Sequence, residues 1–459
     1  MTWWRGVRVA RVALVARVAL CGALLCGALW AAGCTTVSNP RSCADGFCHD
    51  PALPFCDVDG TIAGGQRLTC IAVECTPLEL AACRGDEAIV CNATGDDYDV
   101  THCEGGCDAG TGGCAATHII PRYLPTVCDQ LAPAPELTIA ESMTLDTNID
   151  ANCNGGVVPQ AAGPAICVLR YGKITLDRNR ALKVTGSRAL ALVADEALTI
   201  DGILDVSADG FTDGPGGGFV TILEPTPIAP AGGGGIGFRT KGGSGGDGSG
   251  DGAANNGGAA SMDPALLVDL VGAPGRFSVL PGFGSGAGGA ATMISCRDTV
   301  SILGMIDAGG GGGRGGAAFL FEVDTATGGG AGGNVVLQGM MVKVTGQVFA
   351  NGGGGGAGCQ QNSGNAPEAH PGADGTRSDA EPAQGGAPTN QGEGAGGAGG
   401  LGTSLPGLGK RPTAGNAGAG AGGGSTGFFQ AYMPASVTPM LMPAAASPAF
   451  QTNRTIPTR

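Results

Sequence analysis

Four short stretches of this chain share one frame, in which two apolar residues alternate with other residues and a glycine follows. The frame occupies residues 182–186, 198–202, 300–304 and 342–346. After the last three glycines an apolar residue stands two positions further on, and a small residue follows soon after. Alternation over such short runs is typical of short strands, and a recurring strand-turn-strand unit is typical of a stacked solenoid and not of a sandwich. We therefore predict a mostly β protein built as a parallel β-helix or solenoid.

Glycine provides 89 of the 459 residues and dominates the stretches between these frames. We expect the glycine that ends each frame to take the positive φ of a tight turn. The glycine-rich stretches 211–290 and 352–426 are predicted to be long loops on one side of the solenoid, partly disordered, because glycine has no side chain to bury. Asp263 as N-cap and Pro264 in the first turn predict one short helix within residues 261–275.

The N-terminus has the form of an export signal. Four arginines and no acid lie in the first 17 residues, and 15 uncharged residues follow at 18–32. The motif "AAGC" at 31–34 resembles the lipobox of bacterial lipoproteins, in which the cysteine receives a diacylglycerol. This resemblance makes Cys34 the lipidated N-terminal residue, and Thr35 after it implies sorting to the outer membrane. The alternative is an ordinary secretory signal with Cys34 as a half-cystine.

A cysteine-rich block follows, with ten cysteines between residues 43 and 114. An exported segment with few large apolar side chains needs cross-links, so five disulfides are predicted within the block. Zinc binding with His49 and His102 is the alternative, although no CxxC is present. A further disulfide is predicted between the last two of these candidates: Cys43, Cys48, Cys56, Cys70, Cys75, Cys83, Cys91, Cys103, Cys107, Cys114, Cys153 and Cys167.

The number of cysteines after Cys34 is odd, so at least one thiol has no partner within the chain. Cys296 follows a strand at a position held by Ala194 and Gln338 in matching units. We predict that Cys296 is a buried, unpaired thiol that acts as a small apolar side chain. The sequence leaves the state of Cys128 and Cys359 open.

No catalytic, cofactor or metal motif stands out. Asp205 and Asp307 occupy equivalent places in two frames, with Asp201 and Asp209 nearby, and two carboxylates can serve as acid and base. Turn capping by these aspartates is the favoured interpretation. The segment "GGSGGDGSG" at 242–250 resembles the repeat of calcium-binding β-rolls only in part, which leaves weak calcium binding at Asp247 and Asp251 as an open alternative.

Charge limits the partners. Without residues 1–33 the chain carries 21 basic and 39 acidic side chains, so nucleic acid is excluded as a partner. The predicted organisation is a signal peptide at 1–33, a disulfide-rich module at 34–120, the first solenoid coils at 121–210, glycine-rich loops at 211–290, further repeats at 291–351, a glycine-rich loop at 352–426 and a C-terminal cap at 427–459.

Together, "AAGC", the cysteine block at 83–114 and the strand-rich stretch at 166–210 resemble the glycine-rich surface lipoproteins of myxobacteria. The composition alone is similar to the glycine-rich half of PE-PGRS proteins. The resemblance implies an exported, lipid-anchored protein of the cell surface and brings no catalytic residues. We expect a structural or adhesion function with an extracellular polysaccharide or a surface protein as partner. The alternative is a carbohydrate-active β-helix enzyme, either a lyase or a hydrolase.

Overall fold

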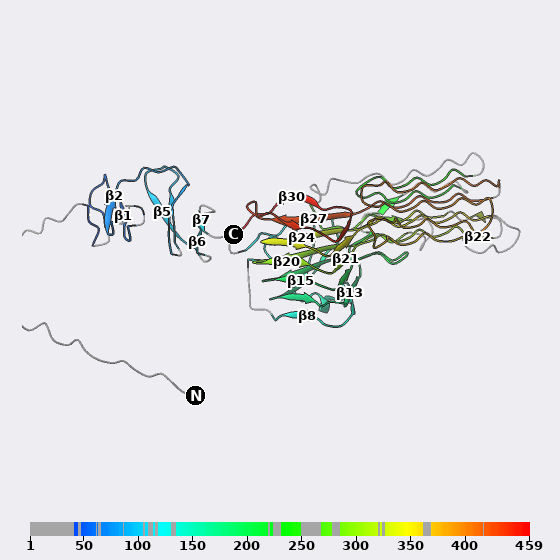
Figure 1. The fold of residues 1–459 in the computed structure, drawn as a ribbon, viewed down its shortest axis with the longest axis horizontal. Coiled ribbons are helices and arrows are strands. Elements are labelled where there is room, and N and C mark those ends of the chain that lie inside the picture. The colour runs from blue at the N-terminus through cyan, green and yellow to red at the C-terminus, as the bar shows by residue number, and fades with distance from the viewer. Residues whose placement is uncertain are drawn as a thin grey trace, which may run out of the picture. The chain divides into compact units, whose positions relative to one another are not determined.

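The computed structural model consists almost entirely of strands and extended segments (Figure 1). Its chain divides into two units, Met1–Ala115 and Ala116–Arg459, which are described separately. The export signal and Cys34 lie outside the described residues. Described are residues 41–44, 47–60, 62, 66–85, 87–103, 106–108, 113–114, 118–129, 135–218, 221–223, 231–248, 268–277, 285–319, 322–323, 326–360, 369–415 and 417–459.

The first unit consists of small antiparallel sheets held by disulfides. Its strands are β1 (Phe55–Asp57) with β2 (Thr69–Ile71), β3 (Leu80–Arg84) with β4 (Glu87–Cys91) and β5 (Tyr98–His102), and β6 (Cys107–Asp108) with β7 (Gly113–Cys114). All ten cysteines of the block pair with one another, which confirms the disulfide-rich module. Two bridges lie within residues 43–70 and three within 75–114, so no bridge joins these two parts. The pairs are Cys43–Cys56, Cys48–Cys70, Cys75–Cys91, Cys83–Cys107 and Cys103–Cys114.

The second unit contains three large sheets, which we call the β11, β12 and β13 sheets. In the β11 sheet the order is β10 (Val157–Val158), β11 (Ile166–Tyr171), β14 (Ala189–Ala194), β19 (Ala290–Ser295), β24 (Asn334–Gln338), β27 (Phe428–Met433) and β30 (Gln451–Thr455). In the β12 sheet it is β8 (Leu137–Ile139), β12 (Ile174–Leu176), β15 (Leu198–Ile200), β20 (Thr299–Ile302), β25 (Met341–Val344) and β28 (Met440–Leu441). In the β13 sheet it is β9 (Met143–Asp146), β13 (Ala181–Thr185), β16 (Ile203–Asp205), β21 (Met305–Asp307), β26 (Gln347–Phe349) and β29 (Ala445–Ser447).

Successive strands go to successive sheets, and their neighbours in each sheet are parallel except at the β10–β11 pair. Thus β11, β12 and β13 are followed by β14, β15 and β16, each beside its counterpart. Alternate side chains from all three sheets meet in one apolar core, because residues two apart on a strand point to the same side. Leu192, Ile200 and Leu204 are fully buried in that core. The one helical element in the described residues is the 3-10 turn η1 (Asp150–Asn152).

The glycine of the recurring frame is required by close packing and not by its φ. In the last three frames the glycine lies between a strand of the β12 sheet and one of the β13 sheet, and none of these three has a positive φ. A Cβ on Gly304 would collide with the carbonyl oxygen of Gly202, and one on Gly346 with that of Gly304. The predicted positive φ is found only at Gly186, which follows β13 at a different corner. Turns stacked backbone on backbone therefore explain the repeated glycine.

Glycine-rich insertions leave the sheets after β16, β21 and β26, always between the β13 sheet and the β11 sheet. The first two contain small two-stranded sheets, β17 (Thr221–Leu223) with β18 (Gly275–Phe277) and β22 (Ala318–Phe319) with β23 (Glu322–Val323). The start of the predicted helix, with Asp263 and Pro264, lies outside the described residues. Residues 268–274 are not helical and β18 begins at Gly275, so the part of this prediction that is described is wrong.

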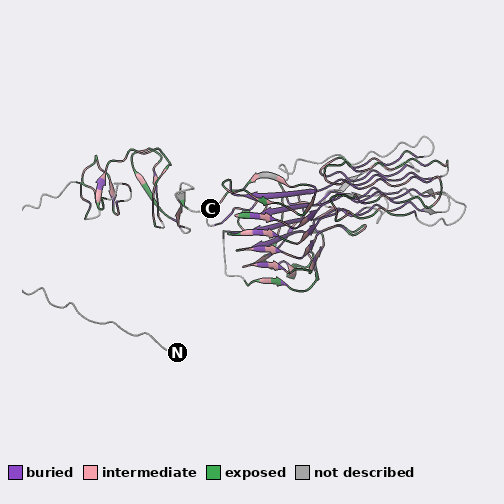
Figure 2. Ribbon diagram, in the orientation of Figure 1, coloured by how far each residue is buried: buried purple, intermediate pink, exposed green. Residues whose placement is uncertain are grey.

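The insertions form an ordered layer that we call the glycine array. Figures 1 and 2 show its segments side by side, extending beyond the sheets and largely buried. Segment 351–358 lies within it, and its N–H groups bond in rotation to three neighbouring segments, with every third residue returning to the same neighbour. That period is the three-residue turn of a polyproline II-type helix. The bonds run from Gly352 to Gly400 and from Gly355 to Gly397, from Gly353 to Gly330 and from Gly356 to Thr327, and from Gly354 to Ala373 and from Ala357 to His370, all at 2.8–3.1 Å.

Where these stretches are described within the array, the prediction that they form loops with nothing to bury is therefore wrong, whereas turns such as residues 401–404 fit it. Its premise was that residues without side chains have nothing to bury. In the array they bury and hydrogen-bond their peptide groups instead, which satisfies the backbone that a buried loop would leave unpaired. A Cβ on Gly353 would collide with the carbonyl oxygen of Gly311, so the segments can approach this closely only as glycine.

Candidate functional site

A row of charged side chains crosses three neighbouring strands of the β13 sheet. In the strand register Lys183 of β13 lies beside Asp205 of β16, which lies beside Asp307 of β21. The adjacent Leu182, Leu204 and Ile306 point into the core, so the charged residues point to the other face. The regular stacking of the strands thus brings together two carboxylates that lie 102 residues apart in the sequence.

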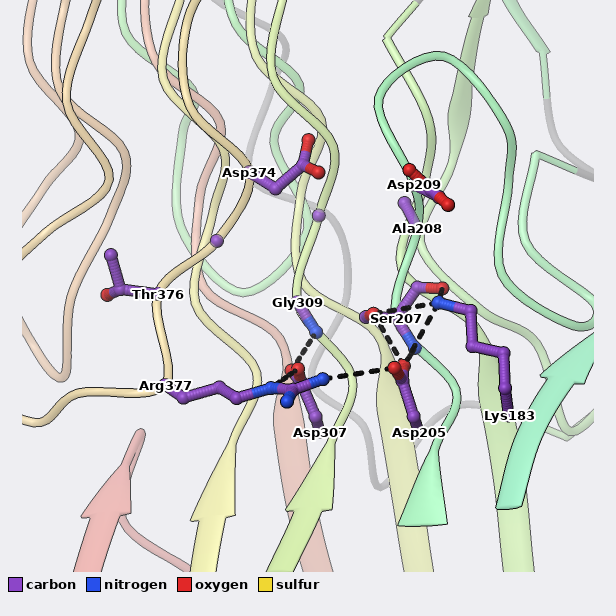
Figure 3. Close-up of a pocket in the computed structure, with 12 residues that line it drawn as sticks. Lys183, Asp205, Ser207, Ala208, Asp209, Asp307, Gly309, Asp374, Thr376 and Arg377 are labelled. Carbon is purple, nitrogen blue, oxygen red and sulfur yellow. Dashed lines mark hydrogen bonds and ion pairs between the residues drawn. The ribbon is translucent and has the colours of Figure 1, made fainter. Parts of the chain in front are cut away.

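Arg377, from the glycine array, bridges the two carboxylates (Figure 3). Its Nε donates to Asp307 Oδ2 at 2.6 Å, and its Nη2 donates to Asp205 Oδ2 at 3.0 Å. The Asp307 side chain is only 4% exposed, that of Asp205 13% and that of Arg377 44%. We call the three residues together the arginine bridge. It joins the glycine array to the β13 sheet.

The remaining carboxylate oxygens are also engaged. Lys183 Nζ lies 3.2 Å from Asp205 Oδ1, which also accepts hydrogen bonds from the hydroxyl and the backbone N–H of Ser207 at 2.6 and 3.0 Å. Asp307 Oδ1 accepts the backbone N–H of Gly309 at 3.0 Å. Both aspartates therefore bond the backbone two residues ahead, which is the turn capping that the sequence favoured.

A cavity of about 420 Å³ lies over this row. Besides the arginine bridge and Lys183, it is lined by Asp209, Asp374 and Thr376 among others, and none of the chain's four histidines lines it. The Asp374 carboxylate accepts the backbone N–H groups of Gly312 at 2.7 Å and Gly210 at 3.2 Å. Asp374 thus ties two further segments of the glycine array together at the rim of the cavity.

Burial and ion pairing act in opposite directions on the bridge. Burial raises the pKa of the Asp307 carboxyl above its ordinary value, and the hydrogen bond and charge of Arg377 oppose that rise. Burial lowers the pKa of Arg377, but the hydrogen bonds and charges of Asp307 and Asp205 outweigh it and raise that pKa. Arg377 therefore stays charged, and the Asp307 carboxyl takes up a proton at a higher pH than an ordinary carboxyl does.

The other predicted acidic residues do not belong to the arginine bridge. Asp201 pairs with Arg178 at 3.2 Å, and Arg178 is 75% exposed. Asp209 lines the cavity. Sequence reasoning missed Lys183 and Arg377, and no signal in the sequence connects the glycine-rich segment around Arg377 with strands so far before it. Asp247 lies in the glycine array, whereas Asp251, the second calcium candidate, lies outside the described residues.

The cysteine predictions need one correction. The predicted pair Cys153–Cys167 is joined, but Cys296 is bonded to Cys128, so the prediction of an unpaired thiol at Cys296 is wrong. Residues 118–129 lie on the outer face of the β11 sheet, where the N–H of Ile119 donates to the carbonyl oxygen of Cys296 at 2.9 Å. Comparing Cys296 with matching strands could not show this covering segment. Cys359 is buried and belongs to none of the seven disulfides of the described residues.

The zinc alternative gains no support from the cysteine block. The sulfur atoms of Cys43, Cys48 and Cys56 lie within 4.8 Å of one another, which is close enough for a metal site. All three are in disulfides, however, and it is the thiolate that binds metal. Their closeness results from two neighbouring bridges.

No protein-family model matches the chain, and no curated protein or solved structure is significantly similar to it. Within the described ranges, we find no helix with the length and apolar character needed to span a bilayer.

Proposed function

We propose that the chain is an exported, non-catalytic structural protein of the cell surface, anchored in the outer membrane through a lipid on Cys34. We also propose that its three large sheets form a parallel β-helix. The β-helix is supported by the strand order, because each sheet takes every third strand and each circuit of the chain adds one strand to every sheet.

The observation that carries a non-catalytic function is the state of the two stacked carboxylates. A carboxylate pair that cleaves glycosidic bonds needs one member free to protonate the leaving group and the other free to attack or to activate water. Asp205 and Asp307 instead share Arg377, and their other oxygens accept further hydrogen bonds. This arrangement serves to join the array to the sheet.

The glycine array supports the same proposal. Its peptide groups bond to neighbouring segments in several directions, which makes it rigid, and its polar side chains at the cavity, such as Asp374 and Arg377, are already bonded within the protein. A rigid, disulfide-linked body suits a protein that must hold its shape outside the cell. Adhesion to an extracellular polysaccharide or to another surface protein fits this proposal.

A carbohydrate-active enzyme is the second candidate, and the cavity beside Asp307, with its raised pKa, favours it. The two candidates make different predictions for Asp307→Asn. If the carboxyl is a general acid, this variant loses all activity on a panel of polysaccharides that the parent protein degrades. If the protein is structural, neither the parent nor the variant releases sugar from any of them.

The lipid anchor is tested by growing cells with an alkyne-tagged fatty acid and then fractionating them. We expect the protein to carry the tag and to sediment with the membranes, and Cys34→Ser to lose the tag and to leave the membrane fraction. Cys26→Ser is the matched control, because it removes a cysteine of the signal segment and leaves Cys34 in place. An untagged parent protein, or a Cys34→Ser variant that keeps the tag, would show that the anchor proposal is wrong.

A further inference from the structure

The segment "LPGLGKR", residues 405–411, runs along the glycine array with the same three-residue period as its neighbours. The N–H of Gly407 donates to the carbonyl oxygen of Ala398 at 2.7 Å, and that of Lys410, three residues later, donates to Ala395 at 2.9 Å. The N–H of Gly409 donates to Ser244 on another segment at 2.8 Å. Two sides of this segment are therefore bonded to the array.

Two leucines of this segment point away from the array. Leu405 is 70% exposed and Leu408 is 65% exposed. With three residues per turn and a rise of about 3.1 Å per residue, they lie on the same side of the segment and about 9 Å apart. Ile236 and Phe238 of the array are instead buried, together with Phe428 of β27. A pair of aligned, exposed leucines on a rigid segment is not explained by packing within the described chain.

Two positively charged side chains follow the leucines in the same segment. Lys410 and Arg411 are exposed, and neither forms an ion pair with another described residue. Arg411 is three residues beyond Leu408 and so continues the side of the leucines, whereas Lys410 is in register with Gly407 and belongs to an adjacent side. The neighbouring segment that contains Ser244 adds Lys241 and one acid, Asp247. In a chain with a net charge of −14 this is a local excess of positive charge.

We propose that Leu405, Leu408, Lys410 and Arg411, which we call the cationic stripe, bind the surface of an anionic phospholipid bilayer. The leucines enter the boundary between headgroups and acyl chains, and the cations lie against the lipid phosphates. The leucines favour a bilayer over an acidic polysaccharide, which offers no apolar layer for them. The stripe would bind the bilayer without a lipid at Cys34, so this proposal can be right or wrong independently of the proposed lipid anchor.

The test uses tryptophan as a reporter of depth. The three tryptophans of the chain, Trp3, Trp4 and Trp30, all lie in the predicted signal segment, and the parent protein gives their background. We would introduce Leu408→Trp and mix the protein with vesicles of phosphatidylglycerol and brominated phosphatidylcholine. Leu303→Trp, at an exposed turn after β20, is the matched control. We expect the bromine atoms to quench the fluorescence of Trp at 408 above the parent background and to leave that at 303 at the background.

The charges are tested by adding Lys410→Gln and Arg411→Gln to the Leu408→Trp protein. Each cation near an anionic surface strengthens partitioning about fivefold, so the two substitutions should weaken it roughly thirtyfold. Raising the salt concentration should have a similar effect on the unsubstituted stripe, because it screens the charges.

Three results would overturn the proposal. The first is equal quenching at 408 and 303, and the second is equal quenching on vesicles of neutral phosphatidylcholine alone. The third is a response of the tryptophan at 408 to soluble polygalacturonate that exceeds its response to the vesicles, which would assign the stripe to an acidic polysaccharide instead.

Discussion

Replacing Arg377 by glutamine should loosen the attachment of the glycine array to the β13 sheet. The variant keeps a polar side chain of similar length but removes the charge that Asp205 and Asp307 share. Two hydrogen bonds of 2.6 and 3.0 Å are lost together, and the Asp307 side chain, which is only 4% exposed, gains little contact with water in exchange.

The expected loss of stability in Arg377→Gln follows from the burial of the ion pair. Removing one partner of a fully buried ion pair costs about 3–5 kcal/mol. Arg377 is 44% exposed, and Asp307 can take up a proton, so we expect a smaller cost of about 2 kcal/mol at neutral pH. A cost of that size opens the attached segment about thirtyfold more often. The Asp307→Asn substitution in the same protein removes the stranded charge and should restore part of the loss.

The pH dependence has a definite sign. The folded-state pKa of Asp307 is raised by burial, and without Arg377 it rises further. A carboxyl with a raised folded pKa stabilises the fold below its unfolded pKa of about 3.9 and loses that contribution as the pH rises through the folded value. The difference between Arg377→Gln and the parent protein should therefore be small in acid and grow towards neutral pH.

Hydrogen exchange of the peptide around residues 369–380 measures this opening. The N–H groups of Gly372 and Gly375 donate to Gly313 and Gly310, so their exchange reports release of the segment. Arg178→Gln is the control, because it breaks an exposed ion pair at another corner of the second unit and should change exchange little. Equal exchange in the two variants, or a difference that is largest in acid, would refute this account of the arginine bridge.

Two further predictions concern packing and cross-links. Gly353→Ala should lower the free energy of unfolding by about 1–3 kcal/mol, measured by chemical denaturation, because its Cβ would meet a backbone oxygen of another segment. Gly415→Ala is the control, because open space surrounds its Cβ and the substitution should not destabilise the protein. Destabilisation by both to the same extent would argue against steric exclusion. Replacing Cys128 and Cys296 by serine should lower the free energy of unfolding by about 5 kcal/mol, since the bridge closes a loop of 168 residues. Mass spectrometry of the unreduced parent should recover the two peptides joined. Recovery of Cys296 alkylated in the parent would contradict the bridge.

The strands and their grouping could be predicted from the sequence because their signal is local. Alternating apolar residues mark short strands, and the repeated frame shows that equivalent strands recur. Pairing in the structure follows the last three frames, with Val300 beside Val342 and Leu198 beside Val300. The first frame, at 182–186, is not equivalent to them, because Leu182 lies in the β13 sheet beside Leu204. The disulfides within the first block were also predictable as a set, because a short exported segment with many cysteines has few other ways to become stable.

The arginine bridge could not be predicted, since its members come from different insertions and strands. Asp205 and Asp307 are recognisable as equivalent positions, but Arg377 lies in a stretch whose sequence has no periodic apolar residues to place it. The same holds for Cys128 and Cys296. Long-range contacts made by segments without a repeating pattern leave no trace in one sequence.

The glycine array continues the sheets by the same hydrogen bonds with a different period. Beyond β21 and β26, where Asp307 pairs with Phe349, the N–H of Ala308 donates to Phe349 at 2.7 Å, that of Gly310 to Asn351 at 2.9 Å and that of Gly313 to Gly354 at 2.8 Å. Backbones joined by such bonds lie about 4.8 Å apart in a sheet. In a sheet, side chains alternate between the two faces, but in the array successive residues also bond to segments on other sides, which leaves room for a Cβ at only some interior positions, such as the buried Ala357 and Ala421. The change from alternating apolar residues to glycine therefore marks the point where the backbone stops bonding within one sheet and begins to bond to neighbours on several sides. The frames at 300–304 and 342–346 lead directly into polyglycine, so the sheets continue into the array at these two places.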